Sequence, residues 1–269
     1  MVTGKLMEIL TYPFFLRALA GVAIISVAVA IIGVYIMSRR MVFLSGGITH
    51  ACFGGLGLGY WLGVSPVAMA ALSAVAGSLG VEWLSSRSRV RSDSAIAVVW
   101  AVGMALGILF IFMTEGYVPE LNSFLFGNVL TVTTADLWWF LGFTVVLSAV
   151  FLIFYRVIVA VAFDPDFSRV RRLPVRFVNY AMTVMVAVAI VLTIRLVGIM
   201  LLMSLLSLPQ MIAETRFRRF GSLITASVAI SLAGGIGGLF VSYFIGVPAS
   251  ATIVLLLVLF FIAASFRRR

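Results

Sequence analysis

Apolar residues occur along the chain in runs of about 20, separated by short polar connections that are often rich in arginine. A helix of about 20 apolar residues crosses the hydrocarbon core of a bilayer. The pattern therefore predicts an all-α membrane protein, a polytopic helical bundle with about nine transmembrane segments. Their approximate bounds are 16–37, 48–63, 66–84, 95–113, 135–155, 177–194, 196–213, 222–244 and 249–266. The run at 48–63 is interrupted by glycines and the run at 196–213 is short, so eight spans remain the alternative.

Basic residues gather in every second connection, and the opposite connections hold almost no lysine or arginine. Cytoplasmic connections of membrane proteins carry an excess of these residues. The alternation therefore predicts an outer amino terminus and a cytoplasmic carboxyl terminus. The residues concerned are Arg39, Arg40, Arg87, Arg89, Arg91, Arg156, Arg169, Arg171, Arg172, Arg176, Arg216, Arg218, Arg219, Arg267, Arg268 and Arg269.

Composition adds to this prediction by excluding several other classes of protein. With 63% hydrophobic and 10% charged residues among 269, the chain is far more apolar than a soluble domain. The net charge of +10 is explained by the arginine clusters of the connections, so we expect no nucleic-acid partner. A single cysteine excludes an internal disulfide framework. The chain has no Walker motif, since its "GGIGG" at 234–238 lacks the lysine, so we expect it not to hydrolyse ATP itself.

Two connections are longer than a tight turn. The inner one, 156–176, contains "FDPDFSRV", in which Asp164 precedes Pro165 as a helix cap precedes a first-turn proline. It predicts a short amphipathic helix with Phe167 and Val170 on one side, and a solvated loop is the alternative. The outer connection contains an apolar segment, 118–128, that lies in the interface or re-enters the membrane.

The stretch "LSGGITHACFGG" at 44–55 holds the only histidine, His50, within a predicted span. An ionisable side chain inside a membrane is costly and is a functional candidate by default. The alternative is a neutral structural histidine that donates one hydrogen bond to a backbone carbonyl. Cys52 lies about 200° further around a helix and is expected to be a small buried residue. The surrounding glycines predict close helix packing or a broken helix that lines a polar path.

Two further polar positions lie near or within spans. Glu82 is close to the inner end of the third span and is expected to snorkel or to pair near Arg87. Pro209 is expected to kink the seventh span and free a carbonyl, to which Gln210 could donate a hydrogen bond.

Five stretches, taken together and in order, resemble the membrane (permease) subunits of bacterial ABC importers for zinc, manganese or iron. The likeness covers nearly the whole chain. The stretches are "SRRMVFLSGGITHA", "SRVRSDSAIAVVW", "LNSFLFGNVL", "FDPDFSRV" and "GLFVSYFIGVPASATIVLLLVLF".

The resemblance implies a type II ABC importer-like fold, with residues 1–269 as a single transmembrane domain in the bacterial cytoplasmic membrane. It also implies a homodimer that works with cytoplasmic ATP-binding subunits and an extracytoplasmic metal-binding protein. Segment 164–173 corresponds to the family's coupling helix, which contacts the ATPase. Its expected contact residues are Asp164, Pro165, Asp166, Phe167, Ser168, Arg169 and Val170. Arg17, at the outer end of the first span, is expected to contact the metal-binding protein or a lipid headgroup.

The resemblance further implies that a divalent metal ion passes His50. Relatives usually carry an aspartate four residues before this histidine, one helical turn away, but here that position is Gly46. A neutral imidazole, two in a homodimer, would then bind the ion with water and backbone carbonyls, and no other cofactor is expected. Two alternatives stay open. A permease for a metal chelate, such as a siderophore or cobalamin, fits the missing carboxylate, whereas a gradient-driven secondary transporter normally needs intramembrane carboxylates.

Overall fold

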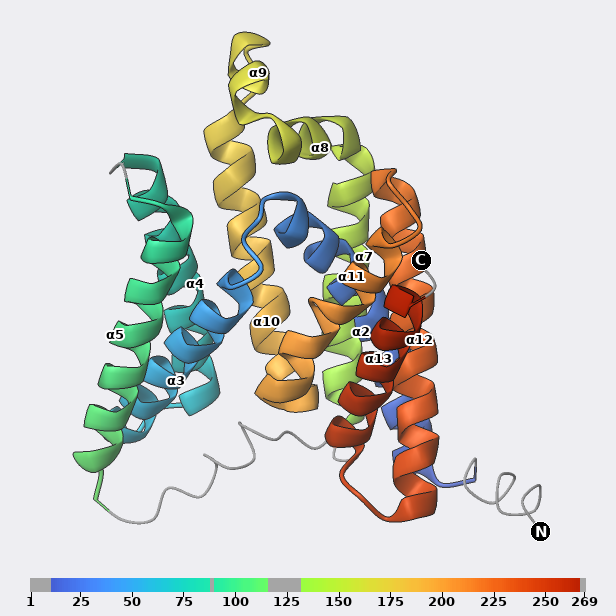
Figure 1. Cartoon of the computed structure of the whole chain (residues 1–269). Helices are drawn as coiled ribbons and strands as arrows, with labels where there is room; N and C mark the ends of the chain where they lie inside the picture. The colour runs from blue at the N-terminus through green and yellow to red at the C-terminus, as the bar shows by residue number, and fades with distance from the viewer. Residues whose placement is uncertain (1–10, 88–89, 116–131, 267–269) are drawn as a thin grey trace. The chain divides into compact units, whose positions relative to one another are not determined.

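The computed structural model describes residues 11–87, 90–115 and 132–266, and these residues form helices and no strand (Figure 1). The long helices of this described part are α2 (Pro13–Ser38), α3 (Leu44–Leu62), α4 (Pro66–Arg87), α5 (Ser92–Phe112), α7 (Thr134–Ile153), α10 (Val175–Leu205), α12 (Phe220–Ile245) and α13 (Ala249–Phe266). The short ones are α8 (Tyr155–Phe163), α9 (Pro165–Val170) and α11 (Leu208–Glu214). The outer segment 118–128 lies outside the described residues.

The predicted all-α membrane fold is confirmed. Among the described residues, 8 helical segments are long and apolar enough to cross a bilayer. They include 175–194 and 196–214. The backbone of Gly198 (φ 75°, ψ 173°) is not helical and interrupts α10 within the second of these segments. The glycine-broken run at 48–63 is also helical, as α3, but this helix, which holds six glycines and His50, is not among those 8 segments. The chain is thus a multi-pass membrane protein.

The described residues cluster into two compact units, and each is considered by itself. Unit 1 takes its residues from Met1–Val34, Asn122–Ala149 and Arg195–Arg269. Unit 2 takes its residues from Tyr35–Leu121 and Val150–Ile194. The single domain over 1–269 stays a prediction.

In unit 2, α3 packs against both α4 and α5, and glycines set the distance between the helices (Figure 1). A Cβ added at Gly54 would lie 2.8 Å from the carbonyl oxygen of Gly103 on α5. One turn further along, a Cβ at Gly57 would lie 2.6 Å from the carbonyl oxygen of Gly107. Backbones this close require small residues on both sides, so the glycine run of α3 serves close packing within a continuous helix.

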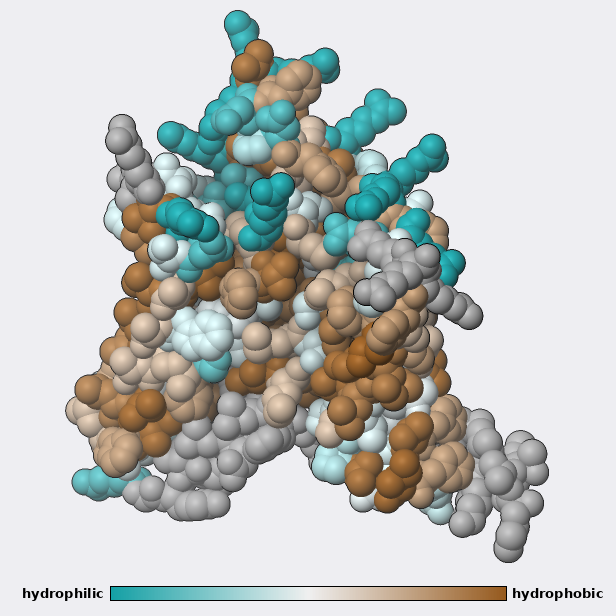
Figure 2. Space-filling view, viewed as in Figure 1, coloured by the Kyte–Doolittle hydropathy of each residue, from teal (hydrophilic) through white to brown (hydrophobic). Residues whose placement is uncertain are grey.

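One side of α5 is apolar and exposed. Val98, Val102, Leu106 and Leu109 are each at least 44% exposed and recur at helical spacing. Figure 2 shows hydrophobic residues over α5 and hydrophilic residues around α9 in the same unit. An exposed apolar stripe on a helix of bilayer length is the surface that lipid covers.

In unit 1, the seventh predicted span is broken rather than kinked. The helix stops after Leu205 and α11 begins at Leu208, with Pro209 in its first turn, where a missing N–H leaves no bond unmade. Gln210 is fully buried, and its Nε2 donates hydrogen bonds to the carbonyl oxygens of Leu205 (3.2 Å) and Val29 (3.1 Å). The predicted bond from Gln210 to a freed carbonyl is therefore confirmed.

Replacing Gly103 by alanine should test the α3–α5 contact. The new methyl group would lie 2.5 Å from the carbonyl oxygen of His50 and 2.7 Å from Cα of Ala51, and backbone atoms cannot move aside by changing a rotamer. We expect Gly103→Ala to reduce stability by about 1–3 kcal/mol or more, measured by thermal unfolding in detergent.

Gly80→Ala on α4 is the matched control, because a Cβ there has no neighbouring heavy atom within 4 Å. It should unfold at the parental temperature or above. Equal unfolding temperatures for the two variants would contradict the close contact.

Candidate functional site

His50 lies within α3, half-buried against α5. Its ring stacks on Trp100, with 4.3 Å between ring centroids and 19° between planes. Its Nδ1 lies 2.9 Å from Sδ of Met104. Trp100 and Met104 are four residues apart and so share one face of α5. The side chain that contacts the ring nitrogen is thus a thioether, and not the backbone carbonyl that a structural histidine was expected to contact.

The surroundings of His50 are poor in other metal ligands. Gly46 occupies the position one turn before it, and Cys52 is fully buried as expected. In the part of the chain that the structure describes, no group of three or more His, Cys, Asp or Glu side chains could hold a metal ion. Those residues therefore do not build a closed storage site, although one imidazole can still act as a ligand for an ion in passage.

The predicted helix in the inner connection is present as α9, with bounds 165–170 inside the expected 164–173. Asp164 caps it: Oδ1 accepts a hydrogen bond from the backbone N–H of Phe167 at 2.8 Å. Pro165 occupies the first turn, and Asp166 forms an ion pair with Arg169 across it. A helix this short gains little stability from its few backbone hydrogen bonds, so the cap and the ion pair are needed to stabilise it.

α9 has a buried side and an exposed side. Ser168 is fully buried, whereas Phe167 is 51% and Val170 is 83% exposed. The guanidinium of Arg171 lies 4.9 Å from the centre of the Phe167 ring, over which it makes a cation–π contact. An exposed apolar pair on a capped, hydrophilic projection has the form of a docking anchor (Figure 2).

α8, the helix before α9, was not predicted from the sequence. Its Ile158, Val161 and Ala162 are buried at helical spacing, which gives the helix one apolar side. The signal was present in "YRVIVAVAF", but an apolar run next to a predicted span was taken as part of a loop.

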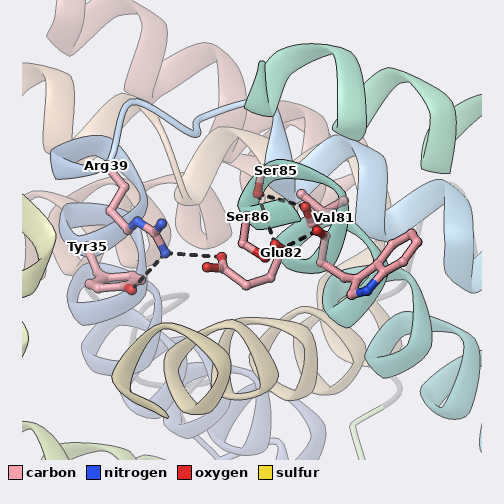
Figure 3. Close-up of polar contacts among 7 residues, drawn as sticks. Tyr35, Arg39, Val81, Glu82, Ser85 and Ser86 are labelled. Carbon is pink, nitrogen blue, oxygen red and sulfur yellow. Dashed lines mark hydrogen bonds and ion pairs between the residues drawn. The ribbon is translucent and has the colours of Figure 1, made fainter. Parts of the chain in front are cut away.

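Glu82 forms an ion pair with Arg39 and not near Arg87, which corrects the expected partner. Figure 3 shows the guanidinium between the carboxylate and the hydroxyl of Tyr35. Nη1 of Arg39 lies 3.4 Å from Oε2 of Glu82 and 3.4 Å from the Tyr35 oxygen. The two charged side chains are only 18% and 5% exposed, so Arg39 links the end of α2 to α4.

The remaining predicted site residue, Arg17, lies near the start of α2. Its Nε donates a hydrogen bond to the carbonyl oxygen of Pro13 at 3.2 Å, which holds the guanidinium beside the first turn. Its contact with a partner protein stays a prediction.

The Arg39–Glu82 pair should stabilise the fold because each charge neutralises the other out of water. Glu82→Met alone should cost about 3 kcal/mol, since breaking a buried pair strands the remaining charge. The double variant Arg39→Met/Glu82→Met should lose less stability than the more damaging of the two single variants, Arg39→Met and Glu82→Met. Thermal unfolding in detergent measures both.

Arg91→Met is the control, because Arg91 and its partner Asp93 are 83% and 55% exposed. It should cost less than about 1 kcal/mol. Strict additivity of the two single changes at 39 and 82 would rule out coupling between them.

Comparison with known proteins gives one consistent result. The model of the ABC 3 transport family matches residues 11–268. The uncharacterized membrane protein slr2045 of Synechocystis is 33% identical over 264 residues, covering 98% of this chain and 94% of that protein. The manganese transport system membrane protein MntC of Halalkalibacterium halodurans is 29% identical, covering 96% and 89%.

Among solved structures, PsaBC from Streptococcus pneumoniae in complex with Fab superposes with a TM-score of 0.84 at 25% identity, covering 98% of this chain and 95% of that one. The assignment of the chain to a family rests on the family model, which matches it from the first described helix to the last. The chain therefore belongs to the ABC 3 transport family.

Proposed function

We propose that this chain is the transmembrane subunit of an ATP-driven importer for a divalent metal ion: zinc, manganese or iron. Membership of the ABC 3 transport family supports ATP-driven transport. Similarity to a manganese transport system membrane protein over 96% of the chain is the observation that carries the substrate class. His50, half-buried in α3, is the ligand that the chain offers to such an ion.

The partners follow from the same reasoning. Two copies form a homodimer in the bacterial cytoplasmic membrane, with the amino terminus outside and the carboxyl terminus inside. A cytoplasmic ATP-binding subunit docks on α9 of each copy, where Phe167 and Val170 are exposed. An extracytoplasmic metal-binding protein delivers the ion and contacts Arg17. ATP binding draws the ATPase subunits together, and α9 transmits that motion to the spans.

The alternatives predict different transport behaviour. A gradient-driven transporter needs carboxylates within its spans, but Asp93 and Asp136 lie in the first turns of their helices and Glu82 is paired with Arg39. These positions do not favour that mechanism. A chelate permease would import a siderophore or cobalamin complex and would ignore the free ion. Uptake of free manganese by the reconstituted complex would therefore distinguish a metal-ion importer from a chelate permease.

Replacing Phe167 by aspartate should uncouple transport from ATP hydrolysis. A buried aromatic anchor at an interface is typically worth 2 kcal/mol or more, so we expect metal uptake to fall by about 30-fold or more. The complex is reconstituted with its ATPase and metal-binding protein, and uptake and ATP hydrolysis are measured together.

Phe167→Leu keeps an apolar anchor and serves as the control, with uptake close to the parent. Parental uptake by the aspartate variant would overturn the role of α9 as the coupling helix.

His50→Ala should reduce manganese uptake in the same vesicles while leaving the complex assembled, because it removes the imidazole ligand. Gly46→Asp should place a carboxylate one turn away and make the metal leave more slowly. Gly46→Asn has the same shape without the charge and controls for packing.

Uptake at the parental rate by His50→Ala would make this histidine structural. Equal retention of metal by the aspartate and asparagine variants would contradict a metal path at this turn of α3.

A further inference from the structure

We propose that Met104 and Trp100 fix the tautomer and orientation of His50, so that Nε2 is the nitrogen presented to a metal ion. The geometry that carries this is the 2.9 Å contact between Nδ1 and Sδ together with the stacked indole. The role toward metal rests on the proposed function, whereas the tautomer does not. Met104 and Trp100 act through His50 and are therefore positioning residues.

The tautomer follows from the chemistry of the thioether. A neutral imidazole carries one N–H and one nitrogen with a free lone pair. The sulfur of methionine is a weak acceptor and has no hydrogen to donate. The short contact to Nδ1 is thus a hydrogen bond only if Nδ1 carries the proton. The lone pair is then on Nε2, whereas free histidine in water favours the proton on Nε2.

The orientation follows from packing on a single turn of α5. Trp100 covers one face of the imidazole ring, and its near-parallel indole would obstruct a ring flip. Gly103 lies between Trp100 and Met104 in the sequence, and a Cβ there would lie 2.5 Å from the carbonyl oxygen of His50. The same turn of α5 therefore holds both the backbone and the ring of His50. Without that hold, an N–H on Nε2 would face the ion and repel it.

The choice of a thioether has a further effect on the ligand. Metal-binding histidines usually donate their second N–H to a carboxylate, a carbonyl or water, which raises the basicity of the ligating nitrogen. A thioether is a weaker acceptor than these groups. It orients the ring but draws the Nδ1 proton away from the imidazole far less. Nε2 is thus aimed but remains a moderate ligand, and Gly46 adds no charge. Both features favour rapid release of an ion over tight retention.

The single histidine makes the tautomer directly observable. The chain is labelled with ¹⁵N-histidine, placed in lipid nanodiscs without metal, and studied by NMR at a pH at which the imidazole is neutral. Coupling of the ring proton Hδ2 identifies Nε2, and the ¹⁵N shift tells whether that nitrogen is protonated. We expect the parent to carry its proton on Nδ1.

Met104→Leu should move the proton to Nε2, because it removes the acceptor and keeps the volume. Met113→Leu makes the same change at the end of α5 and should leave the spectrum unchanged. In the transport assay, Met104→Leu should lower uptake at limiting metal by about 10-fold, the lower end for residues that orient metal ligands.

A parent with its proton on Nε2 overturns the inference, and the parent spectrum decides this even where a variant does not fold. Retention of the Nδ1 proton in Met104→Leu also overturns it. Failure of the proposed function has a different signature: His50→Ala imports metal normally while the parent spectrum still shows the proton on Nδ1.

Discussion

The contact between α3 and α5 at Gly54 and Gly103 is the constraint on which the candidate site depends. Two backbones meet there at a distance that excludes any side chain, and the register of the two helices follows from it. That register brings Trp100 and Met104 onto His50. A shift of one residue would turn both side chains about 100° away from the ring. The position of the imidazole is therefore a consequence of helix packing and needs no ligand to hold it.

Several polar groups elsewhere in the helices find the hydrogen-bond partners that a bilayer cannot supply. Lipid offers no hydrogen bonds, so donors must find acceptors within the protein. Ser26, Thr49 and Thr193 each donate to the carbonyl oxygen four residues earlier on their own helix. Gln210 donates to two carbonyl oxygens, one of them left free where the helix ends at Leu205. The buried charges of Arg39 and Glu82 likewise pair with each other.

The sequence was informative where local chemistry decides the outcome. Lengths of apolar runs predicted the spans, because bilayer thickness sets helix length. The order Asp164–Pro165 predicted α9, because capping depends on adjacent residues. Partners distant in the chain could not be predicted: the arginine beside Glu82 is 43 residues away, and Met104 is 54 residues from His50. The break before Pro209 was placed as a kink, since a proline fits equally in the first turn of a new helix.

The low apolarity of α3 has a consequence for how the chain enters the membrane during synthesis. α3 is not among the described helices that are apolar enough to cross by themselves. A segment with six glycines and a histidine gains little from partitioning into lipid before its neighbours exist. Its glycine face becomes favourable in the bilayer only when the backbones of α4 and α5 are there to pack against it. Insertion of α3 is thus completed by helices translated after it, and its place in the membrane is a property of the three helices together.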